Sequence, residues 1–265
     1  MNSRHFYSAF VLLSLVTAVP AIAQDAPVPG SQAAAYWDKD ELKASRDALK
    51  KEHGGGTHYM ILANRFEYQS GEDSSAAFLE GQGWWGTDEN RLWIKSEIDY
   101  DLDAGSFEEA EVQALWSRPV ARYFDLQAGL RHDFEPGPSR SYAVAGIQGL
   151  APYWFEVGGA IFLSEDGDLS ARVEAEYEFL LTQRLVLQPR TELNFAMQDV
   201  PELETGAGLS TAELGLRLRY EFDRQFAPYV GVNWKASTGD TADFARARGE
   251  DAETLSFVTG IRLWF

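Results

Sequence analysis

Residues 169–181 read Leu-Ser-Ala-Arg-Val-Glu-Ala-Glu-Tyr-Glu-Phe-Leu-Leu, and every odd-numbered position in this run is apolar. After an interruption at 182–183, apolar and polar residues alternate again from 185 to 197. A helix cannot sort residues with a period of two, because its faces repeat every 3.6 residues. The two runs therefore predict two long antiparallel strands joined by a short turn, each with one apolar face and one charged face.

Long strands with two such faces suit a membrane-spanning barrel, in which lipid covers one face and a watery lumen the other. Similar alternation recurs from 58 to 265, which predicts an all-β fold, a transmembrane antiparallel up-and-down β-barrel of about twelve strands. The predicted strands are 58–69, 76–88, 91–103, 106–118, 124–134, 139–150, 153–165, 168–181, 184–197, 208–222, 226–238 and 252–265. Residues 76–88 alternate least well, and without them and one partner the count falls to ten, because single-chain bacterial barrels have even strand numbers.

The residues before the barrel predict export. The apolar run 9–19 is too short to span a bilayer, and Ala-Ile-Ala at 21–23 is a cleavage site, so we expect a signal peptide at 1–23 rather than a membrane anchor. Residues 24–57 are predicted to form a linker and a short periplasmic helix, which Asp38 can cap. The barrel is predicted to occupy residues 58–265.

Composition narrows the function further. The chain carries a net charge of −18 and no cysteine, which excludes thiolate metal sites and disulfides and disfavours a nucleic-acid partner. An acidic surface attracts cations, but it also keeps long loops and a hydrated lumen soluble, and the sign of the charge does not separate these two roles.

Two further expectations concern the strands themselves. Pro189 removes a hydrogen-bond donor from a closed ladder, so we expect a β-bulge there. Aromatic residues near strand ends are expected to form the girdles at the membrane interfaces. They are Trp84, Trp85, Tyr123, Tyr153, Trp154, Tyr229, Trp234 and Trp264.

Several strings in the barrel region resemble the copper resistance protein B family. They are Gln148–Glu156, Arg172–Glu178, Leu181–Arg190, Glu213–Tyr220 and Phe226–Trp234, together with Arg91–Lys95 and Thr241–Arg246. The alternating last strand that ends on Phe265 is likewise typical of outer-membrane barrels. The resemblance implies a protein of the Gram-negative outer membrane that handles copper ions, with a periplasmic copper-binding protein as a further partner.

The sequence departs from the family in its soft metal ligands. Many members carry a Met- and His-rich segment after the signal peptide, but residues 24–51 contain neither residue type. Copper prefers thioether and imidazole ligands, so the candidate metal ligands are His53, His58 and Met60, near the start of the first strand. His58 and Met60 are two residues apart and point to the same side of a strand. The alternative is a polar histidine at the rim and a methionine that packs.

Charged residues on the non-apolar face are expected to line the lumen. The acidic candidates are Glu97, Asp99, Glu109, Glu111, Glu174, Glu176, Glu192 and Glu213, and Arg131, Arg172, Arg190, Arg217 and Arg219 face the same way. They predict either a cation path or a polar plug that stiffens the barrel. His132 and Met197 fall in phase with the lipid-facing residues, His132 near a membrane interface.

Catalysis is not expected. His132 and Asp133 are neighbours on one strand and so face opposite sides, and the sequence contains neither a Gly-x-Ser-x-Gly motif nor a phosphate-binding loop. The predicted function is therefore an outer-membrane barrel of copper resistance or homeostasis, which binds copper ions or passes them across the membrane. The alternative is a general cation-permeable or structural barrel without copper selectivity. The two differ in whether tight copper binding depends on the His and Met candidates.

Overall fold

The structure is a computed structural model that describes residue 33 and residues 36–53, 56–72 and 74–265, except for the side chains of Lys50 and His53. The predicted signal peptide (1–23) and nearly all of the linker before the helix lie outside the described residues. The chain divides into two compact units, 1–54 and 55–265, and each is described here by itself.

The first unit contains the predicted short helix, α1 (Lys39–His53). Asp38 Oδ1 accepts a hydrogen bond from the backbone N–H of Lys39 at 2.8 Å, and Asp40 and Glu41 occupy the first turn. Acidic side chains there are stabilised by the positive end of the helix dipole. No helix of the described residues is long and apolar enough to cross a membrane.

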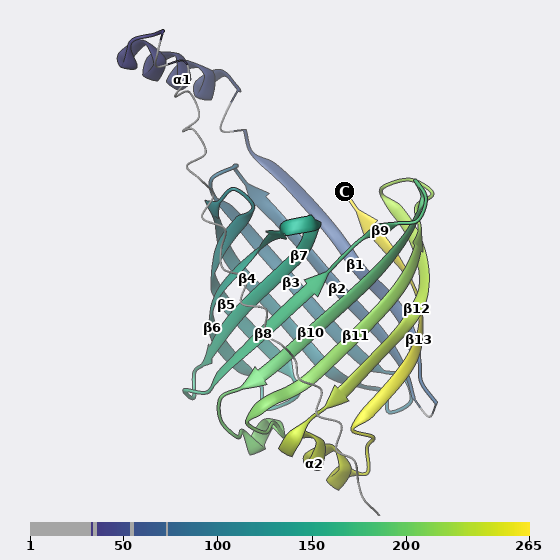
Figure 1. Cartoon of the computed structure of the whole chain (residues 1–265). Coiled ribbons are helices and arrows are strands. Elements are labelled where there is room, and N and C mark those ends of the chain that lie inside the picture. The colour runs from purple at the N-terminus through teal and green to yellow at the C-terminus, as the bar shows by residue number, and fades with distance from the viewer. Residues whose placement is uncertain (1–32, 34–35, 54–55, 73) are drawn as a thin grey trace, which may run out of the picture. The chain divides into compact units, whose positions relative to one another are not determined.

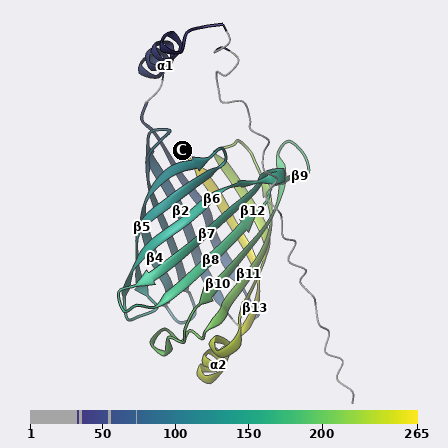
Figure 2. The same cartoon turned by 60° about the vertical axis from the view of Figure 1, so that its left-hand side comes forward.

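The second unit is a closed β-barrel (Figures 1 and 2). Its strands are β1 (His58–Ser70), β2 (Ser75–Gly86), β3 (Arg91–Asp101), β4 (Ser106–Ala121), β5 (Phe124–Glu135), β6 (Arg140–Ala151), β7 (Phe155–Ser164), β8 (Leu169–Glu176), β9 (Phe179–Leu180), β10 (Leu185–Ala196), β11 (Gly208–Tyr220), β12 (Phe226–Ser237) and β13 (Glu253–Trp264). Neighbouring strands are antiparallel, and the β1–β13 pair closes the ring. Because β8 and β9 are two parts of one strand that pairs with β10, the ring has the twelve strands predicted.

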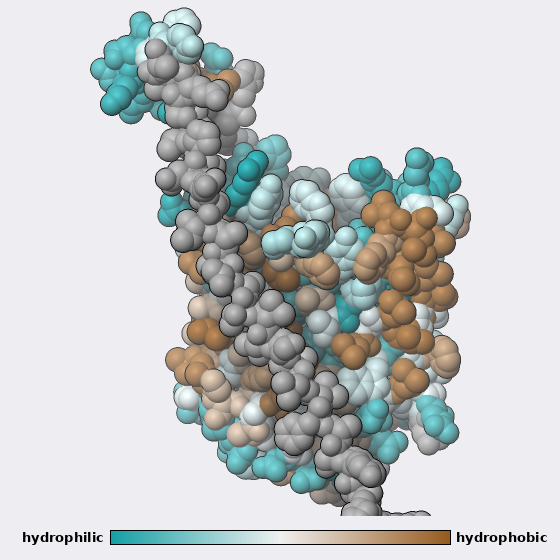
Figure 3. All heavy atoms as spheres, in the orientation of Figure 1, coloured by the Kyte–Doolittle hydropathy of each residue, from teal (hydrophilic) through white to brown (hydrophobic). Residues whose placement is uncertain are grey.

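Alternation places apolar side chains outside and charged side chains inside. Outward Leu130 and Phe257 are 66% and 71% exposed, whereas inward Arg172 is only 8% exposed. In Figure 3 hydrophobic residues gather on the flanks of the barrel between hydrophilic rims. This is the arrangement that a lipid-facing belt and a polar lumen require.

Pro189 does not produce the expected bulge. The register between β10 and its partner strand is the same on both sides of Pro189, with Arg190 opposite Glu176 and Leu187 opposite Phe179. The backbone N–H of Tyr177 donates to the carbonyl of Pro189 at 3.1 Å, but proline has no N–H to return the bond. The missing donor instead interrupts the partner strand, which divides into β8 and β9 at this point.

Two of the predicted girdle residues point inward. Trp84 packs against an interior cluster that includes Trp93 and Leu115, and Tyr229 is only 5% exposed. Both lie on the lumen side of their strands. The alternation of side chains along the strand therefore decides where they point, although both residues lie near strand ends. Trp85 and Trp154 are 62% and 68% exposed and fit the predicted girdles.

The connections at the two rims differ in length. One rim, here called the long-loop rim, carries the 197–207 segment with its short helix η3 (Pro201–Leu203), and the 238–252 segment. The second segment contains helix α2 (Gly239–Arg248), which the sequence analysis did not predict; α2 packs at β11 and β12 through its buried Ala242 and Ala245. The opposite rim, here called the C-terminal rim, carries short turns, the helix η2 (Pro152–Trp154), the start of β1 and Phe265.

Candidate functional site

Ion pairs between distant strands cross the barrel interior, and we call them the central ion-pair layer. Every member points its charged side chain into the barrel and forms at least one ion pair there. The members are Arg65, Glu80, Glu97, Glu109, Glu111, Arg131, Arg172, Glu174, Arg190, Glu192 and Glu213. Carboxylates outnumber guanidinium groups among these residues. The layer is therefore rich in negative charge even after its arginines are counted.

Arg172 of β8 holds one half of this layer together. Its guanidinium nitrogens lie 3.3 Å from Glu97 Oε2, 3.2 Å from Glu111 Oε2, 3.6 Å from Glu109 Oε1 and 3.4 Å from Glu192 Oε1. One guanidinium thus contacts carboxylates from β3, β4 and β10. The planar fork of arginine donors suits this role, because it can serve several acceptors at once.

Arg65 and Arg190 hold the other half. Arg65 Nε lies 2.5 Å from Glu80 Oε2, and its Nη1 lies 3.0 Å from Glu213 Oε1. Arg190 Nη1 lies 3.4 Å from the same oxygen of Glu213, while its Nη2 lies 2.8 Å from Glu192 Oε2. Since Glu192 also contacts Arg172, the two halves form one connected network.

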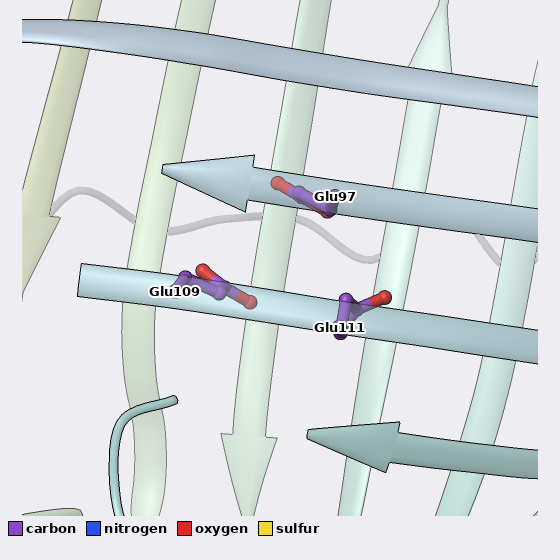
Figure 4. A group of neighbouring side chains, drawn as sticks. All are labelled: Glu97, Glu109 and Glu111. Carbon is purple, nitrogen blue, oxygen red and sulfur yellow. The ribbon is translucent and has the colours of Figure 1, made fainter. Parts of the chain in front are cut away.

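Three carboxylates of the layer gather closely enough to hold a cation (Figure 4). Glu97 lies on β3, whereas Glu109 and Glu111 lie on the neighbouring β4, and oxygens of all three lie within 4.8 Å of one another. The Arg172 guanidinium contacts all three, and Arg131 and Arg65 add ion pairs to Glu111 and Glu97 at 2.7 and 3.7 Å. Carboxylates are hard ligands and do not by themselves select copper.

Two cavities open on either side of the layer. The one toward the C-terminal rim has a volume of about 540 Å³ and is lined by residues such as Asn64, Lys95 and Glu156. The one toward the long-loop rim has a volume of about 1380 Å³, and its lining includes Glu108, Lys235 and residues of α2. We call them the C-terminal cavity and the long-loop cavity.

The two cavities differ in charge. Among the described residues, the long-loop cavity is lined by 11 acidic and 5 basic side chains, whereas the C-terminal cavity is lined by 7 acidic and 6 basic ones. The negative charge of the interior is therefore concentrated toward the long-loop rim. A cleft lined by one sign of charge raises the local concentration of the opposite ion.

The structure places all the acidic lumen candidates on the inward side of their strands. Six of them belong to the central ion-pair layer. Asp99 contacts Lys235, with 3.8 Å between Oδ2 and Nζ, and Glu176 lies opposite Glu156 on β7, where both line the C-terminal cavity.

The soft-ligand candidates lie at the start of β1. His58 is exposed at the C-terminal rim, and Met60 lies two residues further along the same side of the strand. Met60 is partly buried against the interior cluster that contains Trp84 and Trp93. The side chain of His53 lies outside the described parts of the chain. The structure thus shows a packing role for Met60 and leaves His58 available to solvent.

His132 and Met197 lie on the outer surface, in phase with the lipid-facing residues. His132 Nδ1 is 3.0 Å from Ser141 Oγ of β6, and its ring meets Phe134 edge-on at 4.6 Å between centroids. The hydrogen bond between His132 and Ser141 gives both polar side chains a partner on an otherwise apolar face. Met197 is 67% exposed just after β10.

A buried cluster on β1, β11 and β12 escaped the sequence analysis. Arg217 Nε donates to Glu67 Oε1 at 2.7 Å, and Tyr229 donates its hydroxyl hydrogen to the same oxygen at 3.0 Å. Inward glycines make room for it, since a Cβ at Gly260 would lie 2.7 Å from Tyr229 Oη. Alternation predicted the inward direction of Arg217 and could have done the same for Tyr229, but a register shift between Ala63 and Arg65 changes which face of β1 carries Glu67.

Comparisons with known proteins agree with this architecture. The family model described as Copper resistance protein B precursor (CopB) matches residues 57–265. Over 213 residues, or 80% of this chain, the sequence is 45% identical to the copper resistance protein B homolog of Pseudomonas syringae pv. tomato and 42% identical to copper resistance protein B of Escherichia coli. The match covers 72% and 71% of those two proteins.

Among solved structures, the NanC porin superposes with a TM-score of 0.51 at 12% identity, over 78% of this chain and 99% of that one. This likeness shows the fold alone. The closed barrel with its apolar belt and the family match together identify an outer-membrane protein of Gram-negative bacteria, and the chain belongs to the copper resistance protein B family.

Proposed function

We propose that this barrel serves copper resistance or homeostasis by binding copper ions in its lumen or passing them across the outer membrane. The observation that carries the proposal is the unequal charge of the two cavities, with 11 acidic side chains against 5 basic ones toward the long-loop rim. Longer connections face the outside in outer-membrane barrels, so the acidic cavity faces the medium from which metal arrives. Its field concentrates cations at that mouth.

The acidic cavity supplies attraction without selectivity, because carboxylates bind many cations. In the proposed mechanism, the soft ligands His53, His58 and Met60 supply the preference for copper at the periplasmic side. Exposure of His58 at the C-terminal rim supports this assignment. A periplasmic copper-binding protein would exchange metal at the same rim, and the outer-membrane lipid surrounds the apolar belt.

We propose that the chain has three parts. A signal peptide at 1–23 is removed on export, a linker and periplasmic helix occupy 24–57, and the barrel occupies 58–265. We assign no reaction to the barrel. His132 is bonded to a serine on the lipid face, and within the described residues no ion pair joins it to a carboxylate that could orient it as a catalytic base.

Metal association with vesicles tests the proposal. The full-length protein is purified from outer membranes and reconstituted into liposomes, which are incubated with equimolar copper and zinc and then separated by gel filtration. We expect more vesicle-associated copper than in protein-free liposomes, and more copper than zinc. Copper at the level of protein-free liposomes would contradict both binding and passage. Equal copper and zinc would instead support the alternative, a general cation-permeable barrel.

A further inference from the structure

Among the residues that the structure describes, the two cavities of the lumen share two lining residues, Arg172 of β8 and Phe162 of β7. Phe162 is 3% exposed, and two guanidinium groups flank its ring: Arg131 at 4.9 Å and Arg172 at 5.9 Å from the ring centroid. A positively charged group near an aromatic face is held there by the ring quadrupole. The pair thus lies where one cavity ends and the other begins.

Another part of the barrel interior is closed by a buried cluster. On the β1, β11 and β12 side, Glu67, Arg217 and Tyr229 are almost fully buried, Arg217 and Tyr229 both donate hydrogen bonds to Glu67, and none of the three lines either cavity. A small ion that moves from one of these cavities to the other passes Arg172 and Phe162.

We propose that Arg172 and Phe162 form the constriction of the lumen, and that the Arg172 guanidinium restricts the passage of small cations through it. This inference goes beyond the proposed function, because it concerns ions such as K⁺ and does not depend on copper. Arg172 acts as a tethered counter-ion that occupies the carboxylates Glu97, Glu109 and Glu111.

The charges at the constriction explain this role. A cation that enters from the acidic long-loop cavity can reach Glu109, which lines it, but it then meets the fixed positive charge of Arg172 and reaches Glu97 and Glu111 only by taking the place of that guanidinium. Removal of the Arg172 side chain both widens the constriction and exposes buried carboxylates. The lumen should then conduct more current and favour cations more strongly, as acidic pore linings do.

Single-channel recording in planar bilayers under a KCl gradient tests the proposal with the full-length protein. Arg172→Ala is compared with the wild type, with Arg172→Lys, which keeps the charge, and with Arg217→Ala. The last variant is the matched control, because it removes an arginine that is equally buried in the barrel but lines neither cavity. Heat-modifiable gel mobility shows beforehand that each variant is folded.

We expect Arg172→Ala to raise the conductance and to shift the reversal potential toward that of K⁺. Arg172→Lys should keep the reversal potential of the wild type, and Arg217→Ala should keep both properties. A wild-type conductance and reversal potential in Arg172→Ala would overturn the proposal, and so would an equal rise in Arg217→Ala.

Phe162→Ala keeps the test decisive if Arg172→Ala does not fold. This change removes the apolar half of the constriction without altering charge. It should raise the conductance and leave the reversal potential near that of the wild type, and an unchanged conductance would overturn the proposal. The assay contains no copper, so its outcome is separate from that of the metal-association experiment.

Discussion

The Glu67 side chain has 0% exposed surface and lies against the Arg217 guanidinium, whose side chain is 3% exposed. Replacing Glu67 by alanine would leave a buried, unpaired positive charge. Loss of one partner of a buried ion pair costs about 3–5 kcal/mol. We expect a loss of this size in the free energy of unfolding, measured by urea titration in detergent with gel mobility as the readout.

The exposed pair of Arg248 and Glu250 provides the control, since its side chains are 45% and 57% exposed. Glu250→Ala should change the free energy of unfolding by at most about 1 kcal/mol, as is usual for surface ion pairs. Equal losses in the Glu67 and Glu250 variants would show that the buried cluster does not stabilise the barrel.

Side-chain directions in the lumen could be predicted from the sequence, but pairs between distant strands could not. Period-two alternation was sufficient to predict that Arg172, Glu97 and Glu111 face the lumen, because each lies on a regular strand. It could not pair Glu67 with Arg217, which are 150 residues apart and meet only when the barrel closes. The register shift in β1 also moved the inward face of that strand by one residue.

Among the elements, β10 tests how the barrel tolerates a proline. Pro189 accepts a bond from Tyr177 but returns none. Pro189→Val supplies the missing N–H opposite the Tyr177 carbonyl, so β8 and β9 should join into one continuous strand. We expect the free energy of unfolding to rise by about 0.5–1.5 kcal/mol, the usual net value of one hydrogen bond, in the same urea assay.

Leu187→Val is the matched control for this change, because it alters a side chain on the same face of β10 without adding a donor. Its unfolding free energy should not rise. A decrease in the Pro189→Val variant would indicate that the interruption between β8 and β9 relieves strain that a continuous strand would restore.

Helix α2 shows why one element could not be predicted. Its segment, 239–248, carries neither a period-two pattern nor a broad apolar stripe, and its buried residues are only Ala242 and Ala245. Contacts with other elements fix it in place: Gly206 donates its N–H to Thr241 Oγ1 at 2.9 Å, and Arg248 pairs with Glu204. By contrast, α1 was predictable, since a capping Asp38 precedes it and an acidic first turn follows.

At the scale of the whole molecule, the acidic long-loop cavity should make metal association depend on charge and salt. The triple variant Glu72→Gln/Glu108→Gln/Asp251→Asn removes three negative charges from the lining of that cavity. We expect less copper on reconstituted vesicles at low salt and a smaller difference between low and high salt, because the Debye length falls from about 10 Å at 0.1 M to about 3 Å at 1 M.

The control for this variant is Asp40→Asn/Glu41→Gln/Glu52→Gln, which removes the same charge from α1, a helix of the other compact unit. It should keep the copper level and salt dependence of the wild type. If both triple variants lower copper association equally, net charge rather than the acidic cavity attracts the metal.

The central claim is that this barrel prefers copper, and equilibrium dialysis of the purified full-length protein in detergent tests it most directly. Copper is offered as Cu(II) and, with a reductant, as Cu(I), each against excess Zn(II), to the wild type and to the His58→Ala/Met60→Ala variant. We expect the wild type to retain copper against zinc in at least one oxidation state, and the double variant to retain less. If zinc displaces copper from the wild type as readily as from the variant, the proposed preference for copper is contradicted.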